Sequence, residues 1–169
     1  MRLVDVKALR GTGPVYYATA TDTREGVWDG HAFVLSVPAH TIPASAFAGR
    51  AMDLDASTPV DKAMAGAAAH EGAPYDVHTV AQWLDMLEQA QSEGICHMCA
   101  LSVAGQRILI NAAKVATWVR AAGGLLREPV RGSVAETAGV ATLLLRSLEW
   151  PTWELLVAGV SLCSEEETK

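Results

Sequence analysis

Residues 77–92 read VHTVAQWLDMLEQAQS, and their apolar side chains recur at steps of three and four residues. This spacing places the apolar side chains on one stripe of an α-helix, where they can pack against a sheet or another helix. The sequence therefore predicts a helix over 77–92 with one buried face, formed by Val80, Trp83, Leu84, Leu87 and Ala90.

The stretch that follows this helix changes its period. Two short apolar runs, ICHMCALSV (95–103) and QRILI (106–110), flank the dipeptide Ala104-Gly105. A two-residue connection of this kind suits a β-hairpin. Asn111 then offers an N-cap for a second amphipathic helix over 112–122, and two glycines end it.

Both ends of the chain read as strands, because β-branched and aromatic residues alternate there between turn-forming residues. A capping threonine followed by proline also predicts a short helix over 59–70. The order of elements lacks a regular βαβ alternation, so we expect an α+β fold with a mostly antiparallel sheet against two main helices. The predicted strands span 3–9, 15–21, 26–37, 125–130, 139–148 and 152–162.

Length, composition and charge limit the number of domains, the possible partners and the cellular location of the protein. The chain has 169 residues, half of them apolar, which fits a single domain over 1–162 followed by a flexible acidic tail over 163–169. The net charge of −6 argues against direct nucleic-acid binding. The N-terminus shows no apolar signal region, and no stretch is long enough to span a membrane, so we expect a cytoplasmic protein without membrane contact.

The box EGICHMC at 93–99 is the most conspicuous chemical signal, because Cys96 and Cys99 stand three residues apart. Thiol–disulfide exchange is one interpretation. It usually relies on a helix N-terminus to stabilise the thiolate, whereas this pair follows the end of a helix.

A zinc site is the second interpretation of the box, with Cys96, Cys99 and His70 as ligands. His78 fits less well, because a sixteen-residue helix holds its two ends about 24 Å apart. We favour a third interpretation, in which both cysteines are small buried hydrophobes, and therefore expect no cofactor.

Tryptophans outside the helices are the candidate binding residues. Trp28, Trp150 and Trp153 lie in or near turns, where such rings either cover the edge of a core or anchor a partner. Polar residues also cluster around a predicted hairpin, namely Asp22, Glu25, Asp29 and His31. We expect it to be a solvated turn rather than a site.

Several segments resemble a single domain of bacterial DNA sliding clamps. The stretch at 26–37, GVWDGHAFVLSV, is similar to the clamp strand that carries Asp-Gly-His. The stretch at 107–124, RILINAAKVATWVRAAGG, is similar to the clamp strand that leads through Asn into a helix. The strands up to residue 161 are similar to the closing hairpin of a clamp domain. Short phage and mobile-element proteins look like one such domain. The resemblance implies a clamp-like fold used for binding. It carries over no catalytic residue, and helix 77–92 lacks the lysines and arginines of a clamp's DNA-facing helices.

We therefore expect a non-catalytic, acidic interaction module that binds or inhibits a partner protein. An acidic surface favours a basic partner, such as a nucleic-acid-handling enzyme. The alternatives are a clamp-like replication accessory protein, which would be a homo-oligomer, and a small zinc or thiol-redox domain built on the cysteine box.

Overall fold

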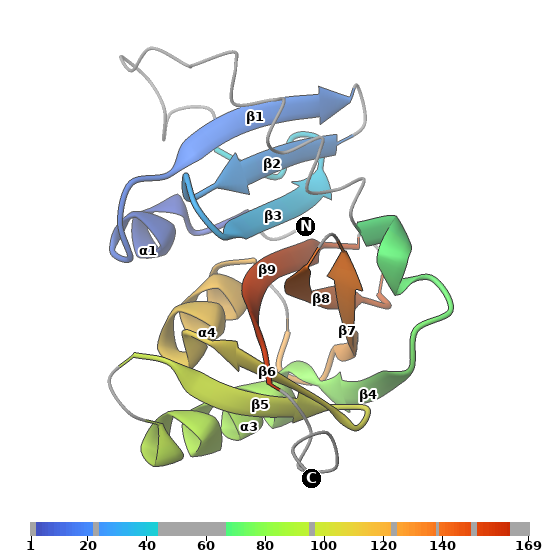
Figure 1. The fold of residues 1–169 in the computed structure, drawn as a ribbon. Helices are drawn as coiled ribbons and strands as arrows, with labels where there is room; N and C mark the ends of the chain where they lie inside the picture. The colour runs from blue at the N-terminus through green and yellow to red at the C-terminus, as the bar shows by residue number, and fades with distance from the viewer. Residues whose placement is uncertain are drawn as a thin grey trace, which may run out of the picture.

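The structure of the protein is a computed structural model. It describes residues 3–21, 24–43, 67–94, 97–122, 125–137, 139–149 and 152–162. The described residues form an antiparallel sheet with helices packed on it, which confirms the predicted α+β class (Figure 1).

Nine strands from both halves of the chain build the sheet. They are β1 Tyr16–Thr21, β2 Arg24–Trp28, β3 Phe33–Pro38, β4 Tyr75–Thr79, β5 Cys99–Val103, β6 Gln106–Ile110, β7 Pro129–Thr137, β8 Val140–Ser147 and β9 Glu154–Ser161. The main order is β1-β2-β3-β9-β8-β7-β4, and the β5-β6 hairpin joins β9 through β6. All neighbouring strands are antiparallel. β1 and β4 therefore lie at opposite edges of the main sheet.

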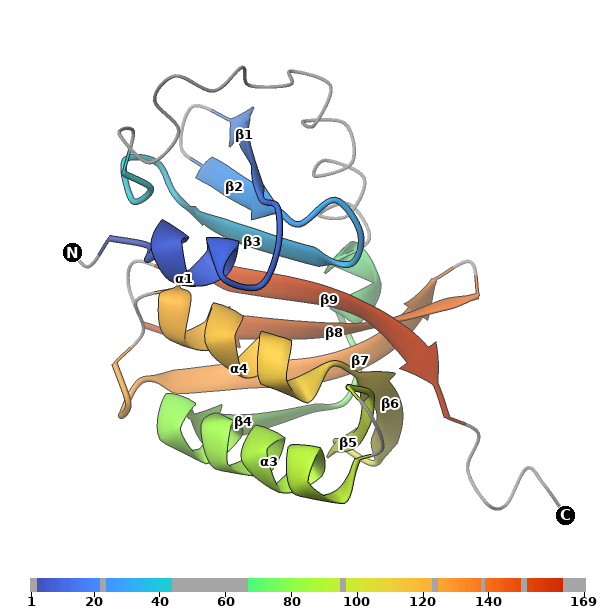
Figure 2. The same cartoon turned by 90° about the vertical axis from the view of Figure 1, so that its left-hand side faces the viewer.

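In the described part of the chain, three α-helices cover one face of this sheet, in the order α1, α4, α3 (Figure 2). Their bounds are α1 Val6–Arg10, α3 Val80–Glu93 and α4 Ala112–Ala121. The 3₁₀ helix η3, Ala67–His70, contacts β7 instead and lies on the other face. The two faces of the sheet are thus covered by very different elements.

The main core lies between the sheet and the three α-helices, with Trp83 and Trp118 among its largest fully buried side chains. Trp83 Nε1 donates a hydrogen bond to the carbonyl of Val130 at 2.9 Å. Its ring lies against Gly132, where an added Cβ would come within 2.3 Å of Trp83 Cη2. The absence of a side chain at residue 132 is therefore what lets α3 seat on β7.

The helix–hairpin–helix order predicted from the centre of the chain is confirmed. α3 starts at Val80 rather than at residue 77, because Thr79 and Gln82 form a reciprocal capping box and the preceding residues join β4. The β5-β6 turn has positive φ at Ala104 and Gly105, as a two-residue hairpin turn requires. α4 is capped by Asn111, whose side chain accepts from the N–H of Lys114.

The strand predicted over 3–9 is wrong, because this segment contains helix α1. Asp5 caps the helix by accepting a hydrogen bond from Ala8 N at 3.1 Å. Val6 and Leu9 are one turn apart and both are buried. A local cap and a three-residue spacing therefore outweigh the apparent alternation of apolar residues.

The helix predicted over 59–70 falls mostly outside the described residues. Its last four residues, Ala67–His70, form the single 3₁₀ turn η3 instead of an α-helix. The acidic tail predicted over 163–169 also lies outside the described part of the chain.

Candidate functional site

The sheet face opposite the α-helices carries side chains in rows that run across the strands, because directly paired residues point to the same side. One row joins Trp28, Val34, Leu156 and Leu144 on four successive strands. All but the half-buried Trp28 are buried, and Ala67 of η3 packs on them. This small second core anchors η3 to the sheet.

A polar row lies next to the apolar one. It runs through Ser36, Glu154, Arg146 and Arg131 on β3, β9, β8 and β7. The Glu154 carboxylate lies 3.4 Å from the Arg146 guanidinium and 3.9 Å from the Arg24 guanidinium. The Arg24 guanidinium also donates a hydrogen bond to the Ser36 hydroxyl at 3.0 Å. Arg131 and Arg146 are direct cross-strand partners, so two positive charges face each other at this point.

His70, at the end of η3, is buried over the same face and both of its ring nitrogens are engaged. Nδ1 lies 2.8 Å from Ser133 Oγ, and Nε2 lies 2.8 Å from Thr142 Oγ1. Thr142 donates its own proton to the carbonyl of Ala135 at 3.3 Å. It must therefore accept from Nε2–H, which leaves Nδ1 to accept the proton of Ser133.

Burial lowers the pKa of His70, and the nearby guanidinium groups of Arg146 and Arg131 lower it further. The imidazole is therefore neutral at pH 7, as the hydrogen-bond chain from Ser133 to Ala135 requires. This chain joins η3 to both β7 and β8.

A serine hydroxyl bound to a neutral imidazole is the arrangement that nucleophilic catalysis uses. Here Ser133 is 2% exposed and His70 is 3% exposed, so both side chains are largely covered by protein in this structure. The partner behind the imidazole is the neutral hydroxyl of Thr142 rather than a carboxylate that would stabilise an imidazolium. The geometry thus favours a structural role for the three side chains.

A cavity of about 190 Å³ opens beside this hydrogen-bond chain, between η3 and the neighbouring strands β7 and β8. Its floor is apolar, and its walls carry the two facing arginines. The lining residues are Ala67, His70, Glu71, Gly72, Arg131, Ser133, Leu144 and Arg146.

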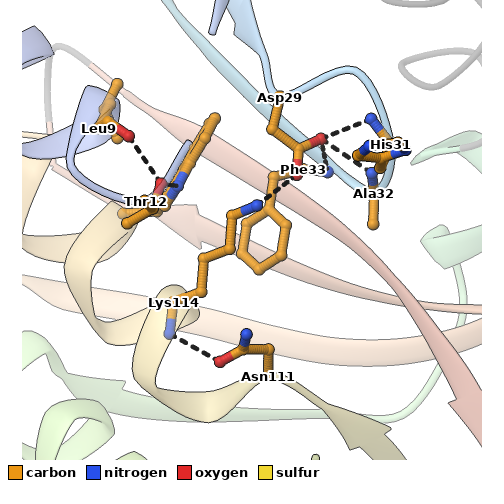
Figure 3. Close-up of polar contacts among 9 residues, drawn as sticks. Leu9, Thr12, Asp29, His31, Ala32, Phe33, Asn111 and Lys114 are labelled. Atoms are coloured by element: carbon orange, nitrogen blue, oxygen red, sulfur yellow. Dashed lines mark hydrogen bonds and ion pairs between the residues drawn. The ribbon is translucent and has the colours of Figure 1, made fainter. Parts of the chain in front are cut away.

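The helix-covered face holds a second polar cluster, shown in Figure 3. Asp29 Oδ1 accepts from the backbone N–H groups of His31, Ala32 and Phe33 at 2.8 to 2.9 Å, while Oδ2 lies 2.6 Å from Lys114 Nζ. The prediction of a solvated turn is wrong for Asp29, since this residue is 6% exposed.

The ionised form of Asp29 is the stable one in this cluster. Burial alone would raise the pKa of Asp29. The hydrogen bonds from Lys114 and from the N–H groups of Phe33 and His31 outweigh burial and hold the pKa below its ordinary value. Lys114 also lies 4.7 Å from the centroid of the Phe33 ring. The cluster ties the β2-β3 turn to α4, and every polar atom of the carboxylate has a partner.

The three tryptophans predicted to bind a partner lie in different settings. Trp28 is half-buried and packs on the apolar row, with its ring 5.8 Å from that of Tyr16. Trp153 is buried in the main core, where Nε1 donates to Glu128 at 3.3 Å, so it covers the core and offers no exposed ring. Trp150 lies outside the described residues. The structure therefore does not gather Trp28 and Trp153 into one surface, and the role of the tryptophans in binding stays a prediction.

Two of the predicted zinc ligands, Cys99 and His70, are not brought together. Cys99 is buried in the main core and its thiol is free, whereas His70 lies on the opposite face of the sheet. Cys96 lies outside the described residues. Within the described ranges, no three His, Cys, Asp or Glu side chains are grouped so that they would hold a metal ion.

Comparison of the chain with protein-family models, with curated proteins and with solved structures gave no match. The resemblance to sliding clamps therefore stays a prediction. Among the described helices, none has the length and apolar character needed to cross a membrane.

The residues that shape the cavity do not stand out in the sequence. Arg131 and Ser133 alternate on β7, and Leu144 and Arg146 alternate on β8, so each pair lies on one face of its strand. This period-2 pattern is visible in the sequence. The strand register that sets the two arginines opposite each other is not.

Proposed function

We propose that this protein is a non-catalytic interaction module that binds an extended segment of a basic partner protein along the open edge of β4. The observation that supports this function is the edge itself. Among the described residues, β4 pairs only with β7, and the side chains of Tyr75 and Val77, on the sheet face that carries η3, are 52% and 45% exposed.

The ladder between β4 and β7 determines which backbone groups point outward. Val80 N donates to the carbonyl of Glu128 at 2.9 Å, and the register pairs His78 with Val130 and Asp76 with Gly132. Backbone hydrogen bonding alternates along an antiparallel pair. The N–H and C=O groups of Tyr75 and Val77 therefore point away from β7, where an added strand would bind them.

The charge on the α3 side of this edge favours a basic segment. α3 is the outermost α-helix on its face and follows β4 directly (Figure 2). Its exposed carboxylates Asp85, Glu88 and Glu93 have no lysine or arginine on the same helix. A segment with basic residues beside its β-strand would meet complementary charge there.

The same carboxylates argue against two other occupants of this edge. If two copies of the chain paired through β4, their acidic α3 helices would approach each other and repel. A DNA backbone would meet the same repulsion on α3, which weakens the clamp-like alternative.

The partner can be trapped with a photo-reactive amino acid placed at Tyr75, in a lysate at physiological salt. We expect an adduct with a basic protein. Val77→Pro should abolish the adduct, because proline removes an N–H that points outward while leaving the β4-β7 ladder intact. A photo-reactive residue at Val160, which is 54% exposed on β9, is the matched control and should give no such adduct.

Two outcomes would contradict the proposal. One is the same set of adducts from positions 75 and 160. The other is an adduct at position 75 that survives both Val77→Pro and Val77→Lys, since the lysine variant tests the edge without restricting the backbone. Thermal unfolding of each variant verifies that it still folds.

A further inference from the structure

The cavity between η3 and the strands β7 and β8 has the composition of an anion site. Its volume of about 190 Å³ compares with roughly 30 Å³ for one water molecule in the liquid, so a small polyatomic ion fits inside. Ala67 and Leu144 form apolar parts of its lining, while Arg131 and Arg146 supply positive charge.

The placement of the two arginines needs an explanation. Like charges directly opposite each other on neighbouring strands destabilise a sheet. Arg146 is offset by Glu154, but among the described residues no carboxylate pairs with Arg131. The Arg131 guanidinium instead lies 3.9 Å from the centroid of the Tyr75 ring, which fixes the orientation of the side chain and leaves its charge uncompensated.

A second observation points to a missing acceptor at the same place. The Nε atom of Arg146 is buried and has no hydrogen-bond partner. Buried donors are nearly always paired in folded proteins. The other polar groups of the wall do not serve Nε, because His70 and Ser133 are already bound to each other. Glu71 is exposed and forms no ion pair with either arginine among the described residues.

We propose that this cavity binds a phosphate group, held by the guanidinium groups of Arg131 and Arg146. Guanidinium forks match the spacing of phosphate oxygens, and two forks approaching from neighbouring strands can engage different oxygens of one tetrahedral group. A carboxylate has only two oxygens, both in one plane, so we expect it to engage two forks less completely than the tetrahedral phosphate group does. The site adjoins the β4 edge through Tyr75, whose ring contacts Arg131, but the argument for it does not depend on the proposed function.

The test is a titration of ¹⁵N-labelled protein with inorganic phosphate in a phosphate-free buffer, with sodium chloride holding the ionic strength constant. We expect saturable shifts of the amide resonances of Gly72 and Ser133. Acetate, titrated over the same concentration range, should bind with an apparent affinity at least tenfold lower than that of phosphate. Phenyl phosphate tests whether the site accepts the phosphate group of a larger ligand, and binding equal to or tighter than that of inorganic phosphate would indicate a monoester.

Variants localise the binding. Arg131→Met and Arg146→Met should each weaken phosphate binding at least tenfold. Arg107→Met, at an exposed arginine on β6, is the matched control and should leave binding unchanged. Arg131→Lys keeps the charge but loses the fork, so it should also weaken binding, and it covers the case in which the methionine variants do not fold.

Three results would overturn the proposal. Shifts that never saturate would indicate an ionic-strength effect. Equal affinity for acetate and phosphate would remove the preference for a tetrahedral ion. Unchanged phosphate binding in Arg131→Lys and Arg146→Met would place the ion elsewhere on the protein.

Discussion

The two faces of the sheet differ in whether their charged side chains have partners within the protein. Under the α-helices, the carboxylate of Asp29 is buried and every one of its acceptor positions faces a donor. On the other face, Arg131 and Arg146 oppose each other and a buried guanidinium nitrogen lacks a partner. The Asp29 cluster is thus paired within the protein, whereas the Arg146 Nε atom is not.

This difference separates folding from recognition. A fully paired buried charge holds elements together, and removing one partner is costly because the other is left uncompensated. Facing like charges lower stability unless something neutralises them. We therefore expect substitutions on the helix-covered face to act mainly on stability, and substitutions on the second face to act mainly on binding.

The largest effect is expected for Asp29→Ala. The substitution removes the carboxylate partner of Lys114 and the acceptor of three backbone N–H groups. It should therefore lower the free energy of unfolding by about 4 kcal/mol. Asp29→Asn retains an acceptor for the N–H groups and should cost less. Urea denaturation followed by circular dichroism measures both.

The matched control lies on the second face. Glu154→Gln disrupts ion pairs with Arg146 and Arg24, whose side chains are 38% and 26% exposed, and such pairs contribute about 1 kcal/mol or less. Equal losses of stability for Asp29→Ala and Glu154→Gln would show that charged groups on the helix-covered face do not contribute more to stability than those on the second face.

The second largest loss of stability, after that for Asp29→Ala, is expected for Gly132→Ala. The new Cβ would meet the Trp83 ring, which is fully buried and has no room to move, so overpacking should cost about 3 kcal/mol. Adding Trp83→Phe makes room for the methyl group, and the double variant should lose less than the sum of the two single variants. Thermal unfolding of all three variants forms the cycle, and strict additivity would disprove the contact.

The elements that the sequence predicted correctly are those with local causes. The stripe of α3, the Asn111 cap and the Ala104-Gly105 turn each depend on residues within one or two turns of chain. The strand prediction for segment 3–9 is wrong because its apolar residues also fit an alternating pattern, whereas the Asp5 cap favours a helix.

The parts that the sequence did not reveal depend on distant pairs. Asp29 and Lys114 are 85 residues apart, and His70 is 63 residues from Ser133. The composition of each segment is ordinary. Only the sheet order and strand register bring these residues together, and neither follows from local periodicity.

The smallest expected effect concerns how folding stability depends on pH, which should differ between the groups on the two faces. The pKa of His70 is lowered in the folded protein, whereas an unfolded histidine has a pKa of about 6.5. Between these values the unfolded chain binds more protons, so stability falls as the pH drops below about 6.5 and levels off below the folded pKa. The pKa of Asp29 is also lowered, but from an unfolded value of about 3.9, so its contribution stays intact until the solution is more acidic.

Mild acid should thus weaken the second face while leaving Asp29 and Lys114 paired. Unfolding temperatures measured between about pH 7.5 and pH 5 should fall more steeply for the wild type than for His70→Gln, because the glutamine amide can bind Ser133 and Thr142 but does not titrate in this range. Asp29→Asn should retain the wild-type slope over the same range. If His70→Gln and the wild type gave parallel curves, the neutral imidazole would not be what couples η3 to the sheet, and the second face would owe its stability to the apolar row alone.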